Sequence, residues 1–254
     1  MKILGSDYDG TLNYFGVDKE KLSAIERWRK VGNKFGVVSG RPPDLAEFLQ
    51  TEYALSLDFL VAFNGGWILD SDGKEIFKAA CEEVELYELV RDLFSWDCPF
   101  AHVNSDKYYL VYREKKDLRA GAYLLENLPQ NLSRPRLLHQ VSVQLSTVEE
   151  AAKTTAKIEE KYGEFLSPLQ NGVCIDIVPR GVNKAQGLQK VAEFFHANTQ
   201  DIITVGDNIN DKDMLQAFTS YAMENGVEEI KAIAGGIVSS VTELIEEELK
   251  KERV

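Results

Sequence analysis

The chain has 254 residues, which suits one large domain or two unequal ones and is ample for a sizeable core. Apolar residues make up 44% and charged residues 28%, and the net charge of −12 argues against nucleic acid as a partner, because nucleic acid requires a basic face. No apolar run approaches the roughly eighteen residues of a membrane helix, and the N-terminus is too short and acidic for a signal peptide. We therefore expect a cytoplasmic protein with no nucleic-acid or membrane partner, and we interpret its three scattered cysteines as reduced thiols.

Residues 1–80 alternate between strand-like and helical patterns. Leu22, Ile25 and Trp28 have helical spacing, and short apolar runs before and after them indicate buried strands. A strand-helix-strand-helix-strand order predicts parallel pairing with right-handed crossovers. The expected strands are 2–7, 34–40 and 58–65, and the expected helices are 17–32 and 42–53.

The pattern changes between residues 82 and 179, where helices accompany mostly hairpin-like strands. We expect an α+β module inserted into the first domain, after which the strand-helix alternation resumes. The domain prediction is a discontinuous core of residues 1–80 and 180–254, with the insertion at 81–179. Within the insertion we expect helices at 82–94 and 147–163, a possible helix at 117–127, and strands at 107–114, 139–146 and 173–179.

Two Asp-x-Asp-Gly sequences occur in different contexts. Asp7-Tyr8-Asp9-Gly10 follows an apolar strand, so both carboxylates could converge beyond the strand's carboxyl end, where open α/β sheets bind ligands. Two close carboxylates can hold Mg²⁺, or one can act as nucleophile while the other carries a proton as general acid. The second copy, 70–73, lies between two short strand-like runs and predicts a hairpin turn.

Two weaker signals follow in chain order. Ser39-Gly40-Arg41 ends the second strand, where a hydroxyl and backbone N–H groups could grip phosphate oxygens, although a simple turn before Pro42 explains the same residues. Lys184 stands near a helix start, where a cation opposes the helix dipole. This conflict hints at an anionic partner for the ammonium group, but a lone lysine is usually just exposed.

The segment after the predicted strand at 201–207 is the strongest second signal. Asp207 ends the strand, and Asn208, Asn210, Asp211 and Asp213 follow. An N-cap at Asn210 or Asp211 would account for one polar residue but not for four oxygen-bearing side chains. Asp207 could reach a metal directly, and Asp211 could ligate it or orient it through water.

Taken in order, "DYDGT", "SGR", Lys184 and "GDNIND" resemble the four motifs of the haloacid dehalogenase (HAD) superfamily of phosphatases. The resemblance covers the whole chain and implies an α/β fold: a Rossmann-like parallel-sheet core with an inserted α+β cap domain of the C2 type. "SGRP", "FNGG" and "GVNKAQGL" are similar to the Cof-like, sugar-phosphatase-like branch, which places Asn64 near the site.

The resemblance also implies a role for each motif residue. Asp7 is the implied nucleophile and Asp9 the implied general acid and base. Mg²⁺ would be held by the side chains of Asp7 and Asp207 and the backbone carbonyl of Asp9, with Asp211 supporting that shell. The implied phosphate- and substrate-binding residues are Thr11, Ser39, Gly40, Arg41, Asn64, Lys184 and Asn210.

The leading hypothesis is thus an Mg²⁺-dependent phosphomonoester hydrolase for a small phosphorylated metabolite, with a sugar phosphate favoured. A phosphomutase or phosphotransferase on the same scaffold and a non-catalytic phosphometabolite-binding module are the alternatives. Specificity has no readable code: His102, Asn104, Tyr108, Arg113 and Gln144 are unranked cap candidates. The substrate, the choice between Mg²⁺ and another divalent metal, and the oligomeric state (monomer or dimer) stay open.

Overall fold

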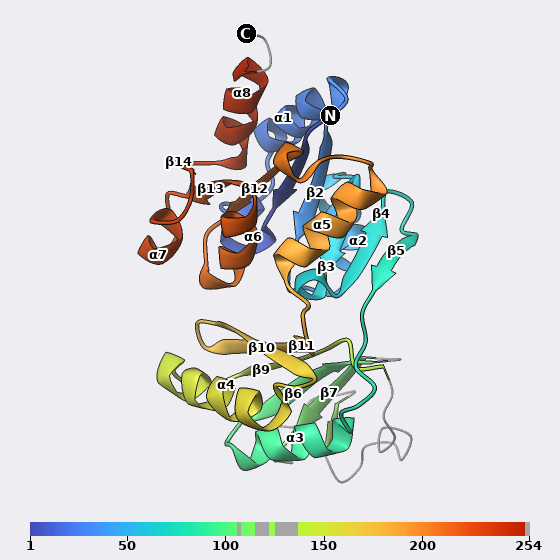
Figure 1. The fold of residues 1–254 in the computed structure, drawn as a ribbon, viewed down its shortest axis with the longest axis vertical. Helices are drawn as coiled ribbons and strands as arrows, with labels where there is room; N and C mark the ends of the chain where they lie inside the picture. Colours follow the sequence, from blue (N-terminus) through green and yellow to red (C-terminus); the bar gives the residue numbers. More distant parts are fainter. Residues whose placement is uncertain (106–107, 115–121, 125–136, 252–254) are drawn as a thin grey trace. The chain divides into compact units, whose positions relative to one another are not determined.

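The computed structural model describes residues 1–105, 108–114, 122–124 and 137–251, shown as a ribbon in Figure 1. The chain divides into two compact units. Unit 1 comprises Met1–Lys78 and Asn183–Val254, and unit 2 comprises Ala79–Val182. Among the described residues, none of the helices combines the length and the apolar character needed to cross a bilayer.

Unit 1 is built on an eight-stranded sheet in the order β14-β13-β12-β1-β2-β3-β4-β5. The strands from β14 to β3 are parallel to their neighbours, whereas β4 and β5 pair antiparallel. Chain segments about two hundred residues apart are therefore adjacent at the centre of the sheet. The strands are β1 (Ile3–Ser6), β2 (Lys34–Val38), β3 (Phe59–Ala62), β4 (Trp67–Asp70), β5 (Glu75–Lys78), β12 (Ile202–Gly206), β13 (Thr219–Met223) and β14 (Gly236–Val238).

Helices cover both faces of this sheet, as expected for parallel strands joined by crossovers (Figure 1). On one face lie α1 (Lys19–Lys30), α2 (Leu45–Tyr53) and α8 (Val241–Lys251). On the other lie α5 (Lys184–Phe194), α6 (Lys212–Ala217) and α7 (Glu228–Lys231).

Helix α1 shows how the sequence pattern produces this packing. The Asp18 side chain accepts a hydrogen bond from the backbone N–H of Lys21, which caps the start of the helix. Ala24, Ile25 and Trp28 then recur on one face and are fully buried against the sheet. Burial of each large apolar side chain of this kind contributes about 1.5–3 kcal/mol, and the indole N–H of Trp28 is satisfied by the carbonyl of Lys34.

The second Asp-x-Asp-Gly sequence is a turn, as predicted. β4 and β5 form an antiparallel hairpin around it. The Asp70 carboxylate accepts hydrogen bonds from the backbone N–H groups of Asp72 and Lys74, at 2.9 and 2.8 Å. Gly73 has φ +74°, the left-handed conformation for which glycine is favoured. The carboxylate of Asp70 is thus used to hold the turn.

Unit 2 contains a six-stranded sheet in the order β10-β11-β9-β6-β7-β8, with two helices packed on one of its faces. Its pairs are antiparallel except for β7 with β8. The predicted fold class, a parallel-sheet core with an inserted α+β module, is confirmed. The elements are α3 (Leu86–Ser95), β6 (Phe100–Asn104), β7 (Tyr108–Tyr112), β8 (Tyr123–Leu124), β9 (Gln140–Gln144), α4 (Val148–Tyr162), β10 (Leu166–Asn171) and β11 (Cys174–Pro179).

The structure corrects one expectation in unit 2 and adds two strands to it. Tyr123–Leu124, inside the possible helix at 117–127, instead forms β8 by pairing with β7, and apart from residues 122–124 that segment lies outside the described residues. β6 and β10 were not predicted. β10 contains Pro168, which lacks a backbone N–H, and the strand is tolerated because it lies at the edge of the sheet.

Candidate active site

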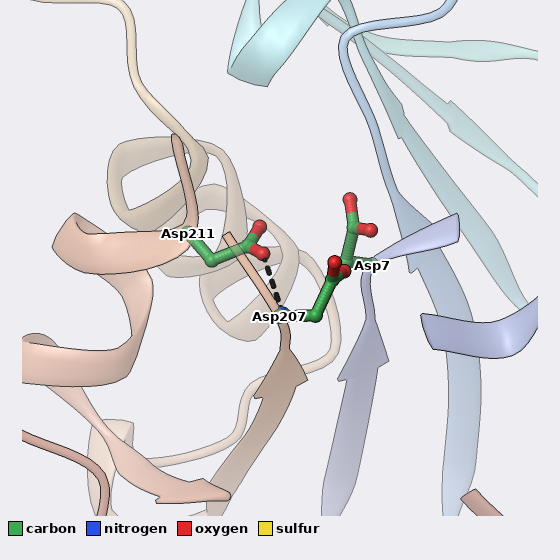
Figure 2. A group of neighbouring side chains, drawn as sticks. All are labelled: Asp7, Asp207 and Asp211. Carbon is green, nitrogen blue, oxygen red and sulfur yellow. Dashed lines mark hydrogen bonds between the residues drawn. The ribbon is translucent and has the colours of Figure 1, made fainter. Parts of the chain in front are cut away.

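Three acidic side chains converge at the carboxyl edge of the parallel sheet (Figure 2). Asp7 directly follows β1 and Asp207 directly follows β12. These strands are neighbours in register, with Ser6 opposite Val205, so the two residues leave the sheet side by side. Asp211 approaches from the turn after β12, and oxygens of the three carboxylates all lie within 4.8 Å of one another.

Lys184 supplies the positive charge of this group. It is the first residue of α5, whose N-cap Asn183 accepts a hydrogen bond from the backbone N–H of Gln186. Its Nζ donates to Oδ1 of Asp7 and to Oδ1 of Asp211, both at 2.6 Å, and only 1% of the residue is exposed. Burial by itself would lower the pKa of Lys184, but Asp211 and Asp7 outweigh it and raise that pKa, so the ammonium stays charged.

Asp211 is fully buried and turns back toward the strand end. Its Oδ2 accepts hydrogen bonds from the backbone N–H groups of Asp207 and Asn208, at 2.9 and 3.1 Å. It precedes α6 but its side chain makes no capping bond to that helix. A β-carbon on Gly206 would come within 2.5 Å of the Asp211 carboxyl carbon, so glycine is needed there. Asp211 therefore braces the segment that carries Asp207.

The carboxylates are short of positive charge. Burial, and then the nearby Asp211, raise the pKa of Asp7 well above its usual range despite Lys184. Burial raises the pKa of Asp207 to about 6, with Asp211 adding to the shift and Thr11 opposing it. Close carboxylate oxygens that resist ionisation without a further cation fit Mg²⁺, a hard cation that favours oxygen ligands. Asp7, Asp207 and Asp211 are the side chains that would hold it.

Metal binding at this group is expected to weaken in acid. A metal ligand must be deprotonated, so Mg²⁺ affinity should fall about tenfold per pH unit below the Asp207 pKa of about 6. Without metal the sign is opposite: the raised pKa means that Asp207 favours the folded state when protonated, and this contribution is lost as pH rises through about 6. Thermal melts with and without Mg²⁺ at pH 5 and pH 7.5 test both statements. A Mg²⁺-induced rise in Tm of equal size at the two pH values would contradict the first statement. The melts without Mg²⁺ test the second.

The segment after Asp7 leaves the strand and forms a tight, irregular turn, Tyr8–Leu12, with a kink at Asp9 and Gly10. Gly10 has φ +81°, and a β-carbon there would lie 2.4 Å from Oδ2 of Asp207. Thr11 is buried, and its hydroxyl donates to Oδ1 of Asp207 at 2.8 Å. Asn225, which sequence reasoning missed because no motif surrounds it, donates from Nδ2 to the carbonyl of Gly10. Gly10, Thr11 and Asn225 thus hold the segment Tyr8–Leu12 in place beside Asp207.

Asp9 has different partners from Asp7. About half of its side chain is exposed, and it lies outside the carboxylate group. Arg41 donates to both of its oxygens, from Nε and Nη2, each at 2.7 Å. The guanidinium also lies over the ring of Tyr8, 5.1 Å from its centroid. We expected the carboxylates of Asp7 and Asp9 to converge beyond the end of the strand. This expectation is corrected, because the strand ends at Ser6 and the Asp9 side chain lies away from the carboxylate group.

The remaining predicted residues lie at the ends of β2 and β3, except Asn210, which follows β12. Ser39 and Asn64 are buried, and the backbone N–H of Asn64 donates to the carbonyl of Ser39 at 2.9 Å. The backbone N–H of Arg41, just beyond Gly40, donates to the hydroxyl of Ser39 at 3.2 Å. Asn210 is half-buried in the turn Ile209–Asp211. A β-carbon on Gly65 would lie 2.2 Å from the carbonyl of Asn183, so this region also abuts the start of α5.

The sequence matches a known family of hydrolases. A family model described as haloacid dehalogenase-like hydrolase matches residues 4–244. The chain belongs to this family, and the predicted resemblance and the predicted class of enzyme, a HAD-type phosphatase, are confirmed.

Relatives and solved structures agree over nearly the whole chain. The 5-amino-6-(5-phospho-D-ribitylamino)uracil phosphatase YitU of Bacillus subtilis is 25% identical over 244 residues, covering 91% of this chain and 90% of that protein. A haloacid dehalogenase-like hydrolase structure from B. subtilis has a TM-score of 0.82 at 20% identity, covering 97% of this chain and 99% of the other. The HAD subclass IIB sugar phosphatase BT4131 has a TM-score of 0.79 at 19% identity, covering 97% and 98%.

Proposed function

We propose that the protein is an Mg²⁺-dependent phosphomonoester hydrolase that acts on a small phosphorylated metabolite through an aspartyl-phosphate. The observation that carries this proposal is the buried group at the carboxyl edge of the sheet. There Asp7, Asp207 and Asp211 lie within 4.8 Å and Lys184 bonds two of them. Unit 1 would be the catalytic core and unit 2 the cap.

Asp7 is the proposed nucleophile. One of its carboxylate oxygens bonds to phosphorus while the bond from phosphorus to the leaving oxygen breaks, giving the aspartyl-phosphate and an alkoxide. Asp9 donates its proton to that alkoxide and then accepts a proton from the attacking water. Water attack breaks the bond between Asp7 and phosphorus, which releases phosphate and restores both carboxyl groups.

Lys184 offsets the charge problem of this chemistry. A carboxylate approaching a phosphate dianion is repelled, and a pair of unit charges 4 Å apart is worth roughly 4 kcal/mol at an effective dielectric of 20. Left uncompensated, that repulsion would slow attack about a thousandfold, since each 1.36 kcal/mol is tenfold in rate. The ammonium 2.6 Å from Asp7 is placed to oppose it. Bound Mg²⁺ would supply further positive charge on the phosphate oxygens.

Ser39, Thr11, Asn64 and Asn210 are the proposed polar contacts for the transferring phosphate. Their support is position: they lie on the turns after β1, β2, β3 and β12, which end at the same sheet edge. A sugar phosphate or similar phosphorylated polyol is the proposed substrate class. Support comes from the names of the similar proteins, one a phosphatase for a 5-phospho-D-ribityl compound and one a sugar phosphatase. A cytoplasmic location stays a prediction from the sequence.

A phosphoester panel tests the proposal. Purified protein with Mg²⁺ is incubated with sugar phosphates, polyol phosphates and p-nitrophenyl phosphate, and free phosphate is measured. We expect release that depends on Mg²⁺ and favours sugar or polyol phosphates. Absence of release from the whole panel, combined with ligand-induced stabilisation by a phosphosugar, would instead support the non-catalytic binding module. An isomerised phosphosugar without free phosphate would support a mutase.

The Arg41–Asp9 pair gives a prediction on catalysis. Arg41→Lys keeps the charge but loses the two-pronged contact, because an ammonium cannot donate from two planar N–H groups. If Arg41 holds Asp9 in position, kcat/KM for a sugar phosphate should fall by about ten- to a hundredfold. Steady-state kinetics of Arg41→Lys beside Arg27→Lys, whose partner Glu246 is on the distant helix α8, measure this. Equal kinetics for both variants would show that Arg41 has no such role.

A further inference from the structure

Lys21, on the first turn of α1, is buried but contacts none of the residues assigned above to metal or phosphate. Only 6% of the residue is exposed. Its Nζ donates to the backbone carbonyls of Tyr14 and Gly16, at 2.6 and 2.5 Å. A buried ammonium held by two carbonyls of one loop is a costly arrangement, because burial penalises the charge. The contact between Lys21 and these two carbonyls therefore needs a functional explanation.

The loop that Lys21 holds is strained at Phe15, whose side chain is exposed. Phe15 has φ +58° although it is not glycine, and Gly16 follows at φ +85°. The Phe15 side chain is 89% exposed, so its burial does not compensate for this backbone conformation. A cavity of about 200 Å³ adjoins the loop and is lined in part by Tyr14, Phe15 and Lys21. Tyr14 packs against the hydrophobic core, whereas the exposed Phe15 does not, and charge-assisted hydrogen bonds from Lys21 anchor the carbonyls on either side of Phe15.

Hydrogen bonds connect this loop to the proposed catalytic turn. Tyr14, whose carbonyl accepts from Lys21, donates its backbone N–H to the carbonyl of Thr11 at 3.1 Å. Thr11 in turn donates its hydroxyl to Asp207. The same turn, Tyr8–Leu12, carries Asp9. A shift of the loop at Tyr14 would therefore move the backbone on which the proposed general acid is mounted.

We propose that Lys21 is a positioning residue: by clamping the carbonyls of Tyr14 and Gly16 it fixes the turn Tyr8–Leu12 and keeps Asp9 placed to protonate the leaving group. This inference rests on the proposed function, because it requires Asp9 to act as an acid. It predicts a selective defect. Esters with poor leaving groups need protonation in the transition state, whereas p-nitrophenolate leaves without it.

The test compares kcat/KM for two substrates on the same preparation. The alkyl probe is D-ribose 5-phosphate, or another sugar phosphate that the wild type hydrolyses, and the aryl probe is p-nitrophenyl phosphate. The ratio of the two constants is independent of the fraction of active enzyme, and kcat/KM is not affected by the later hydrolysis of the aspartyl-phosphate. Lys21→Met should lower kcat/KM about tenfold or more for the alkyl probe and less than about threefold for the aryl probe.

Three further variants make the test decisive. Lys19→Met removes an exposed lysine from the same helix turn and should leave the ratio unchanged. Asp9→Asn should give the same selective loss, only larger. Gly16→Ala strains the loop at a positive φ without steric contact, because no atom lies within 4 Å of the added carbon, and should shift the ratio in the same direction as Lys21→Met. If Lys21→Met does not fold, the ratio measured for Gly16→Ala tests the proposal in its place.

The outcomes separate the two proposals. A wild type that hydrolyses neither probe contradicts the proposed function itself. A selective loss in Asp9→Asn, with an unchanged ratio in Lys21→Met or Gly16→Ala, overturns the role of Lys21 and leaves the proposed function standing. Equal losses for both probes would show that Lys21 has only a structural role.

Discussion

Replacing Asp7 with asparagine is expected to abolish turnover of every phosphomonoester that the protein hydrolyses. The amide has nearly the same shape as the carboxylate but cannot attack phosphorus, so no aspartyl-phosphate can form. Loss of a catalytic group of this kind costs about 10⁴-fold or more in kcat. Free-phosphate release measures the loss, and acid-quenched mass spectrometry should detect one added phosphoryl group on the wild type and none on the variant.

The protein contains its own control for this experiment. Asp72 stands in the second Asp-x-Asp-Gly sequence, in the hairpin between β4 and β5, and Asp72→Asn should leave activity unchanged. Asp7→Asn should still fold, because the amide oxygen at position 7 can accept from Lys184 and Asp211 remains as the charged partner of that ammonium. Residual turnover within about tenfold of the wild type, in a folded Asp7→Asn protein, would sink the nucleophile assignment.

The contrast between the two Asp-x-Asp-Gly copies shows how far sequence reasoning extends. Both have the residues of a turn, and only chain context separates them. The first follows a buried strand and has ordered partners at Ser39, Lys184 and Asp207. The four motifs in order, through the family resemblance that they carry, implied that Asp7 and Asp207 meet at one sheet edge, where parallel strands end on the same side. The carboxylate convergence in Figure 2 agrees with that prediction.

Local side-chain pairing was beyond such reasoning. The prediction that Arg41 binds phosphate stays a prediction, but its pairing with Asp9, 32 positions away in the chain, was not foreseen. Which cation pairs with which carboxylate depends on backbone turns of a few ångströms. Asp9 lies beyond the end of the strand, in an irregular turn with a kink at Asp9 and Gly10. Asn225 was missed for the same reason. Its amide reaches Gly10 from a loop that has no distinctive pattern.

The insertion was the least predictable part of the fold. The core of unit 1 has a long, regular alternation of strands and helices. By contrast, β6 is a short segment, Phe100–Asn104, and the alternation of buried and partly buried side chains along it depends on its pairing with β7 and β9. β10 is interrupted by Pro168, which by itself argues against a strand. Tertiary pairing overrode local preference in both cases, as is common for strands.

Replacing Lys184 with methionine is expected to cost both stability and activity. The side chain keeps its length and apolar stem but loses the ammonium that bonds Asp7 and Asp211. Removal of one partner from a buried ion pair typically lowers the free energy of unfolding by about 3–5 kcal/mol, because a buried charge loses its compensation. Activity should fall by about a thousandfold, the factor derived above for uncompensated repulsion.

The stability of Lys184→Met is expected to depend on pH. Without the ammonium the pKa of Asp7 is raised further in the folded state, so this carboxyl favours folding when protonated and opposes it when ionised. The variant should therefore lose stability relative to the wild type as pH rises from about 5 to 8. Denaturant unfolding at several pH values measures this difference. Lys190→Met, on the same helix and with its ammonium over the ring of Phe77, should cost less than about 1 kcal/mol at all of them.

The effect of Mg²⁺ on Lys184→Met gives a second test of the charge compensation assigned to Lys184. If the three carboxylates hold the ion, a divalent cation replaces part of the charge that Lys184 supplied, so Mg²⁺ should raise the Tm of Lys184→Met more than that of the wild type at neutral pH. The activity should nonetheless stay low, because the ammonium is also needed against the incoming phosphate. If the stability of the variant relative to the wild type were unaffected by both pH and Mg²⁺, the ammonium would not influence the proton affinity of Asp7 in the folded protein. In that case the charge compensation assigned to Lys184 would have to be given up.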